Sequence, residues 1–123
     1  MPTDHEVANF IRASFRSVWS LELLRHLREN RARSLGHQEM VASLRGSDLV
    51  VTQSLEMLAA AGLIVVEADG AARYMPVGLE ADALVEAAEA LYAKSPDNVR
   101  RMIISASNPS LSAFADAFRL KRD

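Results

Sequence analysis

The chain has 123 residues, half of them apolar and 24% charged, which is the size and composition of a single soluble globular domain. It contains no cysteine, so disulfide bonds, thiolate metal sites and cysteine nucleophiles are excluded. The net charge of −2 gives no overall attraction to nucleic acid.

Neither a membrane segment nor a secretory leader is expected. The N-terminal stretch carries Asp4, His5 and Glu6 and lacks an apolar core of signal-peptide length. The longest uncharged apolar stretch, residues 57–66, is too short to cross a bilayer. We therefore expect a cytoplasmic protein of bacterial type that has no membrane partner.

The charges are distributed unevenly along the chain. Between residues 12 and 45 there are seven arginines and three glutamates, a local net charge of +4. From residue 46 to the end, acidic residues outnumber basic ones by four. The pattern indicates either a basic face or arginines spread over a solvated helix.

Two helices are predicted in the first third of the chain, because apolar residues recur there at three- and four-residue spacing. Either Ser14 or Ser17 is placed to cap the break between them, and the second helix is expected from about Val18 to Asn30. The next apolar position, Leu35, together with Ser34, is a candidate one-residue strand.

A short helix and a longer one follow. The short helix is predicted at His37–Leu44 and is followed by the turn Arg45-Gly46-Ser47. Ser47 is a good N-cap for a helix from Asp48 to Ala61. Gly62 suits a left-handed residue just after the end of that helix.

A β-hairpin is predicted next. Two β-rich segments, Leu63–Glu67 and Arg73–Val77, flank the turn-forming pair Asp69-Gly70. Pro76 and Gly78 then mark a boundary. We expect two parts of the chain, residues 1–77 and residues 78–123.

The second part is predicted to be helical. One helix is expected from about Leu79 to Lys94, and another from Ser95 or Asp97 to about Ala106. On the first of these, three acidic residues share a face that we interpret as solvated. They are Asp82, Glu86 and Glu89.

The order helix, short helix, turn, helix and hairpin is that of a winged helix-turn-helix. The segment QEMVASLRGSDLVVTQSLEMLAAAGLI, followed by ARYMP, resembles the winged helix-turn-helix of bacterial transcriptional regulators of the MarR, ArsR and GntR kind. The resemblance covers about residues 35–77. It implies a mostly α-helical fold with a small β-hairpin (α+β class), a winged helix-turn-helix with additional N- and C-terminal helices.

The resemblance also implies a regulator that binds double-stranded DNA through helix 48–61 and a short wing. Gln53 stands where the family commonly has an arginine, and its amide is able to read an adenine edge. We expect contacts with bases and phosphates from residues on this helix, its preceding turn and the wing. They are Arg45, Ser47, Thr52, Gln53 and Arg73.

A protein-binding function is the alternative. Helix 48–61 has no basic residue and carries Glu56, which repels phosphate. Its face opposite the core residues also includes Leu49, Val50 and Met57, an apolar surface suited to a protein partner. The same fold would then act as an adaptor.

The end of the chain is predicted to contain a last amphipathic helix. Leu111, Phe114 and Phe118 lie on one stripe of it. In regulators of the similar kind, added helices form homodimers that match two DNA half-sites. The stripe therefore either forms a homodimer interface or packs against the rest of the chain as core.

No enzymatic activity is expected. The three histidines, His5, His26 and His37, lack the spacing of a metal site. The sequence also has no glycine-rich phosphate loop and no Gly-x-Ser-x-Gly motif. We expect neither a metal nor a cofactor.

Overall fold

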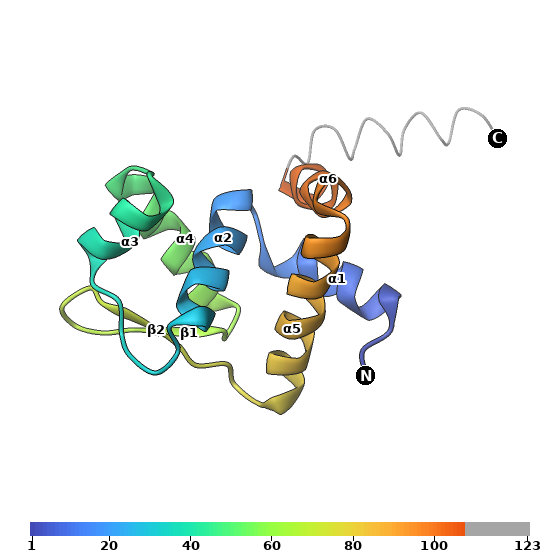
Figure 1. The fold of residues 1–123 in the computed structure, drawn as a ribbon, viewed down its shortest axis with the longest axis horizontal. Helices are drawn as coiled ribbons and strands as arrows, with labels where there is room; N and C mark the ends of the chain where they lie inside the picture. Colours follow the sequence, from blue (N-terminus) through green and yellow to red (C-terminus); the bar gives the residue numbers. More distant parts are fainter. Residues whose placement is uncertain (108–123) are drawn as a thin grey trace.

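Six helices and two short strands make up the part of the chain that the computed structural model describes, residues 1–107 (Figure 1). The predicted stripe of Leu111, Phe114 and Phe118 lies outside the described residues. The mostly helical α+β class is confirmed for the described part. The elements in chain order are α1 (Asp4–Ser14), α2 (Val18–Glu29), α3 (His37–Leu44), α4 (Asp48–Ala60), β1 (Ile64–Val66), β2 (Ala72–Tyr74), α5 (Leu79–Lys94) and α6 (Pro96–Ser107).

Side-chain caps determine where the first helices begin. The Thr3 hydroxyl accepts a hydrogen bond from the Glu6 amide, and the Glu6 carboxylate accepts one from the Thr3 amide, a reciprocal capping box at the start of α1. At the break before α2, the Ser17 hydroxyl accepts a hydrogen bond of 3.2 Å from the Ser20 amide. Ser17, rather than Ser14, is therefore the cap.

The end of α4 requires a glycine. Gly62 has a φ of +76°, in the left-handed region that side chains disfavour. The amide of Gly62 donates to the carbonyl of Ala59 at 3.0 Å, and the amide of Leu63 donates to the carbonyl of Leu58 at 3.1 Å. These two bonds form the motif that commonly ends helices at a left-handed glycine, as predicted for this position.

The two strands are shorter than expected. β1 pairs with β2 in antiparallel register, with Ile64 opposite Tyr74. The predicted second strand, Arg73–Val77, begins one residue too late and ends three residues too late. Beyond Tyr74 the amides of Met75 and Val77 donate to the carbonyls of Leu63 and Gly62, which lie in the turn between α4 and β1, so the chain stays paired there without forming further strand.

A third segment extends the sheet by one residue. Leu35 forms an isolated antiparallel bridge with Ala72, with amide-to-carbonyl distances of 2.8 and 2.9 Å in the two directions. The predicted one-residue strand at this position is confirmed. The bridge holds the connection between α2 and α3 against the hairpin.

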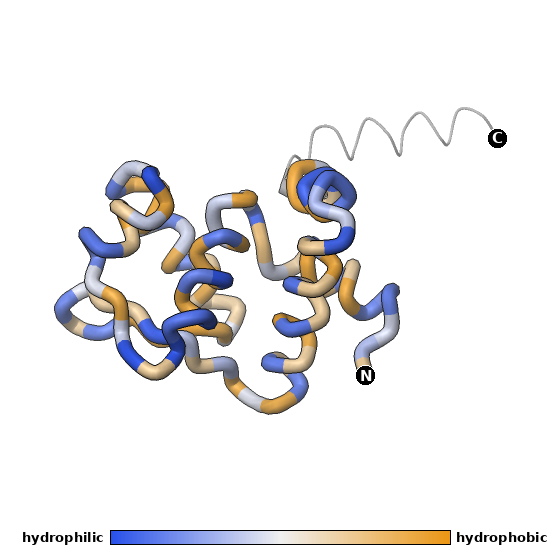
Figure 2. The backbone as a smooth tube through the Cα atoms, in the orientation of Figure 1, coloured by the Kyte–Doolittle hydropathy of each residue, from blue (hydrophilic) through white to orange (hydrophobic). Residues whose placement is uncertain are grey.

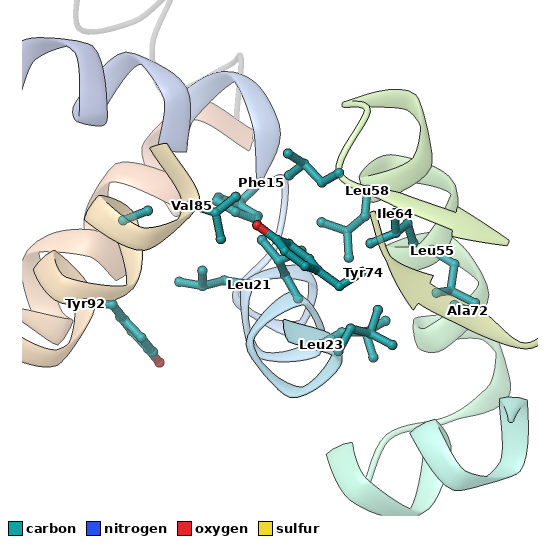
Figure 3. Packing of buried hydrophobic residues seen from close by; sticks show 14 of the residues in the cluster. Phe15, Leu21, Leu23, Leu55, Leu58, Ile64, Ala72, Tyr74, Val85 and Tyr92 are labelled. Atoms are coloured by element: carbon teal, nitrogen blue, oxygen red, sulfur yellow. The ribbon is translucent and has the colours of Figure 1, made fainter. Parts of the chain in front are cut away.

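α2 lies between two groups of elements (Figure 1). On one side it packs against α3, α4 and β2, and on the other side α1, α5 and α6 pack against one another. Hydrophobic residues alternate with hydrophilic ones along these helices in the way expected when one side of each is buried (Figure 2). Buried side chains from both groups form a single cluster, which includes Phe15, Leu21, Leu58, Tyr74 and Val85 (Figure 3).

Candidate nucleic-acid interface

The turn between α3 and α4 holds an arginine in an unusual backbone conformation. Arg45 has a φ of 54° and a ψ of 35°, and within residues 1–107 it has the only positive φ outside glycine. A left-handed conformation costs a side-chain-bearing residue about 1–2 kcal/mol. The Arg45 side chain is exposed and forms no hydrogen bond or ion pair within the described part of the chain. The backbone thus positions Arg45 just before α4, and its guanidinium is available to a ligand.

The start of α4 is fixed by side chains of α3. The Asp48 carboxylate accepts a hydrogen bond of 3.3 Å from the Gln38 amide, and the same oxygen lies 3.1 Å from Nε2 of His37. Ser47 accepts a hydrogen bond of 3.2 Å from the Val50 amide, so its hydroxyl acts as the N-cap that the sequence predicts. The carboxylate nearest to Arg45 in sequence is thus already bound by α3.

The exposed face of α4 was predicted correctly in part. Val51, Leu55 and Leu58 are buried as expected, and the predicted contact residues Thr52 and Gln53 are exposed to solvent. Ser54 is buried as well, on the same side as the apolar residues. α4 therefore presents short polar side chains beside the Arg45 turn.

The predicted apolar surface of α4 is only partly exposed, so the prediction that all three of its residues face a partner is wrong. Leu49 is 64% exposed, whereas Val50 and Met57 are half-buried. Val50 lies near Gly46, where an added Cβ would lie 3.6 Å from its Cγ1. Met57 lines a shallow depression at the end of α1. Neighbouring elements thus cover part of the apolar surface that the sequence assigned to a partner, and Leu49 remains exposed.

Sequence reasoning missed Trp19 on α2. The indole is 43% exposed, and its Cζ3 would lie 3.8 Å from a Cβ added at Gly46, so it stands beside the turn between α3 and α4. Trp19 falls outside the apolar stripe of α2, and an aromatic residue on the polar side of a helix is the signal that would have identified it. It is the single tryptophan of the chain.

The hairpin presents the second predicted cation. Arg73 lies on β2 opposite Val65, and both side chains are exposed. No hydrogen bond or ion pair engages the Arg73 side chain within residues 1–107. In the turn, Oδ1 of Asp69 accepts a hydrogen bond of 3.0 Å from the amide of Ala71, so this acidic group shapes the turn.

Three of the seven arginines between residues 12 and 45 form ion pairs with carboxylates of the same chain. Arg28 donates to Glu89 at 2.8 Å, and Arg25 lies 3.9 Å from the same carboxylate. Arg33 pairs with Glu39, and this hydrogen bond holds the pKa of the Glu39 carboxyl below its ordinary value. The other four are exposed, with no ion pair among the described residues: Arg12, Arg16, Arg31 and Arg45.

The interpretation of the acidic face of α5 as solvated is wrong for Glu89 and holds only in part for Asp82, whose side chain is 41% exposed. The Glu89 side chain is 19% exposed and binds Arg28, and Asp82 accepts a hydrogen bond of 2.6 Å from the Tyr74 hydroxyl. Glu86 is exposed, as predicted. Burial, together with the adjacent Asp82 carboxylate, raises the pKa of the Tyr74 phenol well above its ordinary value.

A second polar contact joins α2 to the last helices. The Tyr92 hydroxyl donates to Glu22 at 2.6 Å, and the guanidinium of Arg25 lies over the Tyr92 ring at 5.1 Å from its centre. Arg100 of α6 also lies over this ring, at 5.6 Å. Burial, with the Glu22 carboxylate beside it, raises the pKa of the Tyr92 phenol. These residues connect the arginine-rich α2 to α5 and α6.

Comparisons with protein-family models, curated proteins and solved structures found no match to this chain. Within residues 1–107, no helix has both the length and the apolar character needed to cross a membrane. The same residues contain no cluster of three or more histidine, aspartate or glutamate side chains suited to holding a metal ion.

Proposed function

We propose that α2, α3, α4 and the hairpin form a winged helix-turn-helix that binds double-stranded DNA. α4 would enter the major groove, and the hairpin would serve as a short wing. The order of the elements, the cap at Ser47 and the bridge from Leu35 to the hairpin all support this architecture. The proposed role is that of a non-enzymatic transcriptional regulator in the cytoplasm.

The observation that carries the proposal is the exposed, unpaired Arg45 in its left-handed turn. Glycine would adopt this conformation at little steric cost, whereas arginine costs about 1–2 kcal/mol. Strained residues of this kind concentrate at functional sites, where the surrounding structure holds them in the strained conformation. A cation at the start of a groove-binding helix is placed to contact a backbone phosphate.

The exposed residues of α4 supply the means to read bases. The Gln53 amide is suited to a bidentate contact with adenine, which discriminates by about 1–3 kcal/mol. Thr52 is exposed beside it and offers a hydroxyl and a methyl group. Arg73 on the hairpin and Arg31 after α2 would add phosphate contacts. Because this gives few cations per chain, a homodimer on two half-sites is part of the proposal.

The test uses Trp19 as an internal reporter beside the proposed contact surface. Fluorescein-labelled duplex DNA of mixed sequence is titrated with the full chain, and both the anisotropy of the label and the Trp19 emission are recorded in a series of salt concentrations. Binding is expected to weaken as salt rises, since each phosphate contact releases counterions. Removing one contact with Arg45→Gly is expected to lower the slope of log affinity against log salt by about one.

Matched variants separate charge from backbone effects. Arg45→Lys retains the cation and is expected to keep most of the affinity, whereas Arg45→Gly loses it without disturbing the turn. Arg33→Ala serves as the control, because Arg33 is already paired with Glu39. The DNA proposal is overturned if no binding occurs at low salt, or if Arg45→Gly combined with Arg73→Ala leaves the affinity unchanged.

The exposure of Trp19 and Leu49 near the same turn favours one alternative function, that of a protein-binding adaptor. These side chains are 43% and 64% exposed, and large apolar side chains at a surface mark protein contacts. An adaptor would lose its partner on Leu49→Asp but keep it on Arg45→Gly. Affinity capture with these two variants distinguishes this function from DNA binding, because a DNA-binding protein would lose affinity on Arg45→Gly.

A further inference from the structure

An open groove of about 730 Å³ lies between the start of α1, α5 and α6. Its apolar lining includes Val7 of α1, Ala87, Ala90 and Leu91 of α5, and Met102 of α6. The helices that line it, α1, α5 and α6, lie on the other side of α2 from α3 and α4 (Figure 1). The groove is therefore separate from the proposed DNA-binding surface.

The shape of this lining favours large apolar side chains. Three alanines, Ala83, Ala87 and Ala90, recur at helical spacing along α5 and line the groove with small side chains. Leu91 and Met102 are half-buried and also face it. A helix face lined with small residues leaves a groove into which the larger side chains of a neighbouring helix can pack. No side chain among residues 1–107 fills the space.

The sequence beyond α6 contains a matching segment. Leu111, Phe114 and Phe118 are spaced by three and four residues, so that a helix would carry them on one face. They follow Ser107, the last residue of α6, after the turn-forming residues Asn108, Pro109 and Ser110. Helix-to-helix connections of two to eight residues are common. Met102 and Asn98 bring α6 itself to the groove.

We propose that residues 111–118 of the same chain bind in this groove as an amphipathic helix, with Phe114 and Phe118 against the alanines of α5. The short connection gives this segment an effective concentration of about millimolar at its own groove. A second copy at micromolar concentration competes poorly with a tethered segment. The inference does not depend on DNA binding, and it means that the homodimer of the proposed function would form through a surface other than this stripe.

Cysteine cross-linking tests the proposal in the full chain, because the natural sequence has no cysteine. The variant Ala90→Cys with Ala115→Cys places one thiol in the groove and one beside the phenylalanine stripe. We expect an intramolecular disulfide under mild oxidation at low protein concentration. The product should migrate as a single chain and revert on reduction.

The control moves one thiol by less than a turn of α5. Ala93 is exposed but does not line the groove, so Ala93→Cys with Ala115→Cys is expected to give about tenfold less disulfide, since the two Cβ atoms must approach within about 4.5 Å. Equal yields from the two pairs would overturn the proposal. Disulfides that join two chains would also overturn it, and would assign the groove to a second copy.

A pair of adjacent substitutions tests the role of the apolar stripe. In the Ala90→Cys and Ala115→Cys background, Phe114→Asp is expected to lower the disulfide yield about tenfold by removing an apolar contact. Ala113→Asp introduces the same charge on the opposite side of a helix and should leave the yield unchanged. Equal effects of the two substitutions would contradict the proposed orientation.

Discussion

Nη1 of Arg28 on α2 donates a hydrogen bond of 2.8 Å to the carboxylate of Glu89 on α5, across 61 positions of sequence. The two side chains are 18% and 19% exposed, so solvent screens the pair only in part. Nε of the same guanidinium lies 3.7 Å from Asp82, too far for a hydrogen bond. The contact with Glu89 is thus the principal polar link at this point between α2 and α5.

Replacing Glu89 with glutamine should measure the strength of this link. The amide keeps the shape but loses the charge, and we expect Glu89→Gln to lower the free energy of unfolding by about 1–2 kcal/mol. Urea denaturation followed by circular dichroism provides the measurement. Glu86→Gln, on the exposed side of α5, is the matched control and should change stability by less than about 0.5 kcal/mol. Equal effects at the two positions would show that the pair contributes no specific stability.

Tyr74 should make the stability fall at high pH. Its phenol ionises at a pKa of about 10 in the unfolded chain, while burial and the Asp82 carboxylate raise the pKa in the folded chain. The unfolded state therefore releases this proton first. The stabilisation is complete below about pH 10 and is lost as the pH rises toward the folded pKa.

The variant Tyr74→Phe separates this effect from general alkaline unfolding. It removes the hydrogen bond to Asp82, and we expect it to lower the free energy of unfolding by about 1–2 kcal/mol at pH 8. Between about pH 10 and 11 the wild-type protein should lose stability more steeply than the variant. Urea denaturation of the wild-type protein and the variant at about pH 8, 10 and 11 makes the comparison. Parallel curves would mean that the phenol has the same pKa in the two states.

Gly62→Ala should be strongly destabilising. The left-handed φ of +76° costs an alanine about 1–2 kcal/mol, and the new Cβ would lie 2.9 Å from Cγ1 of Val77. We expect a loss of about 1–3 kcal/mol, partly recovered when Val77→Ala removes the contact. Gly46→Ala is the control, because its φ is outside the left-handed region and a Cβ there would make only ordinary contacts, the nearest at 3.6 Å. Thermal unfolding by calorimetry should show little change for the control.

Arg45→Gly should stabilise the fold. Relief of the left-handed conformation, less the entropy that glycine adds to the unfolded chain, predicts a gain of about 0.5–1 kcal/mol. Arg45→Ala leaves the backbone cost in place and should give no gain. If both variants had the same melting temperature, the turn would not be strained. Under the proposed function, the stabilised Arg45→Gly protein is also the weaker DNA binder.

Local sequence signals predicted the ends of most elements. Ser47 and Gly62 each act on backbone groups within five residues of themselves, so their roles follow from neighbouring sequence alone. The bounds of α3 and α5 also agree with the prediction. The second strand was misplaced because the partners of Met75 and Val77 are Leu63 and Gly62, which belong to the turn after α4 and not to β1, and β-propensity does not reveal where a partner strand ends.

The candidate site was less predictable, because its electrostatics depend on distant partners. Glu89 and Asp82 have the helical spacing of a solvated face, and only the packing of α5 on α2 brings them to Arg28 and Tyr74. The exposure of Arg45 and Arg73 agrees with the sequence-based expectation, but the backbone strain at Arg45 has no sequence signal. The half-burial of Val50 and Met57 likewise depends on neighbouring elements.

The packing of α1 has a consequence for the order in which the protein forms. Val7 and Ile11 are buried where α1 meets α5 and α6, yet α1 is synthesised before both of these helices. At translation rates of 5–20 residues per second, roughly 3–13 s separate the completion of α1 from the appearance of α5. Throughout that interval Val7 and Ile11 lack their partners from α5 and α6, so we expect the nascent chain to expose an apolar stretch that the folded protein buries.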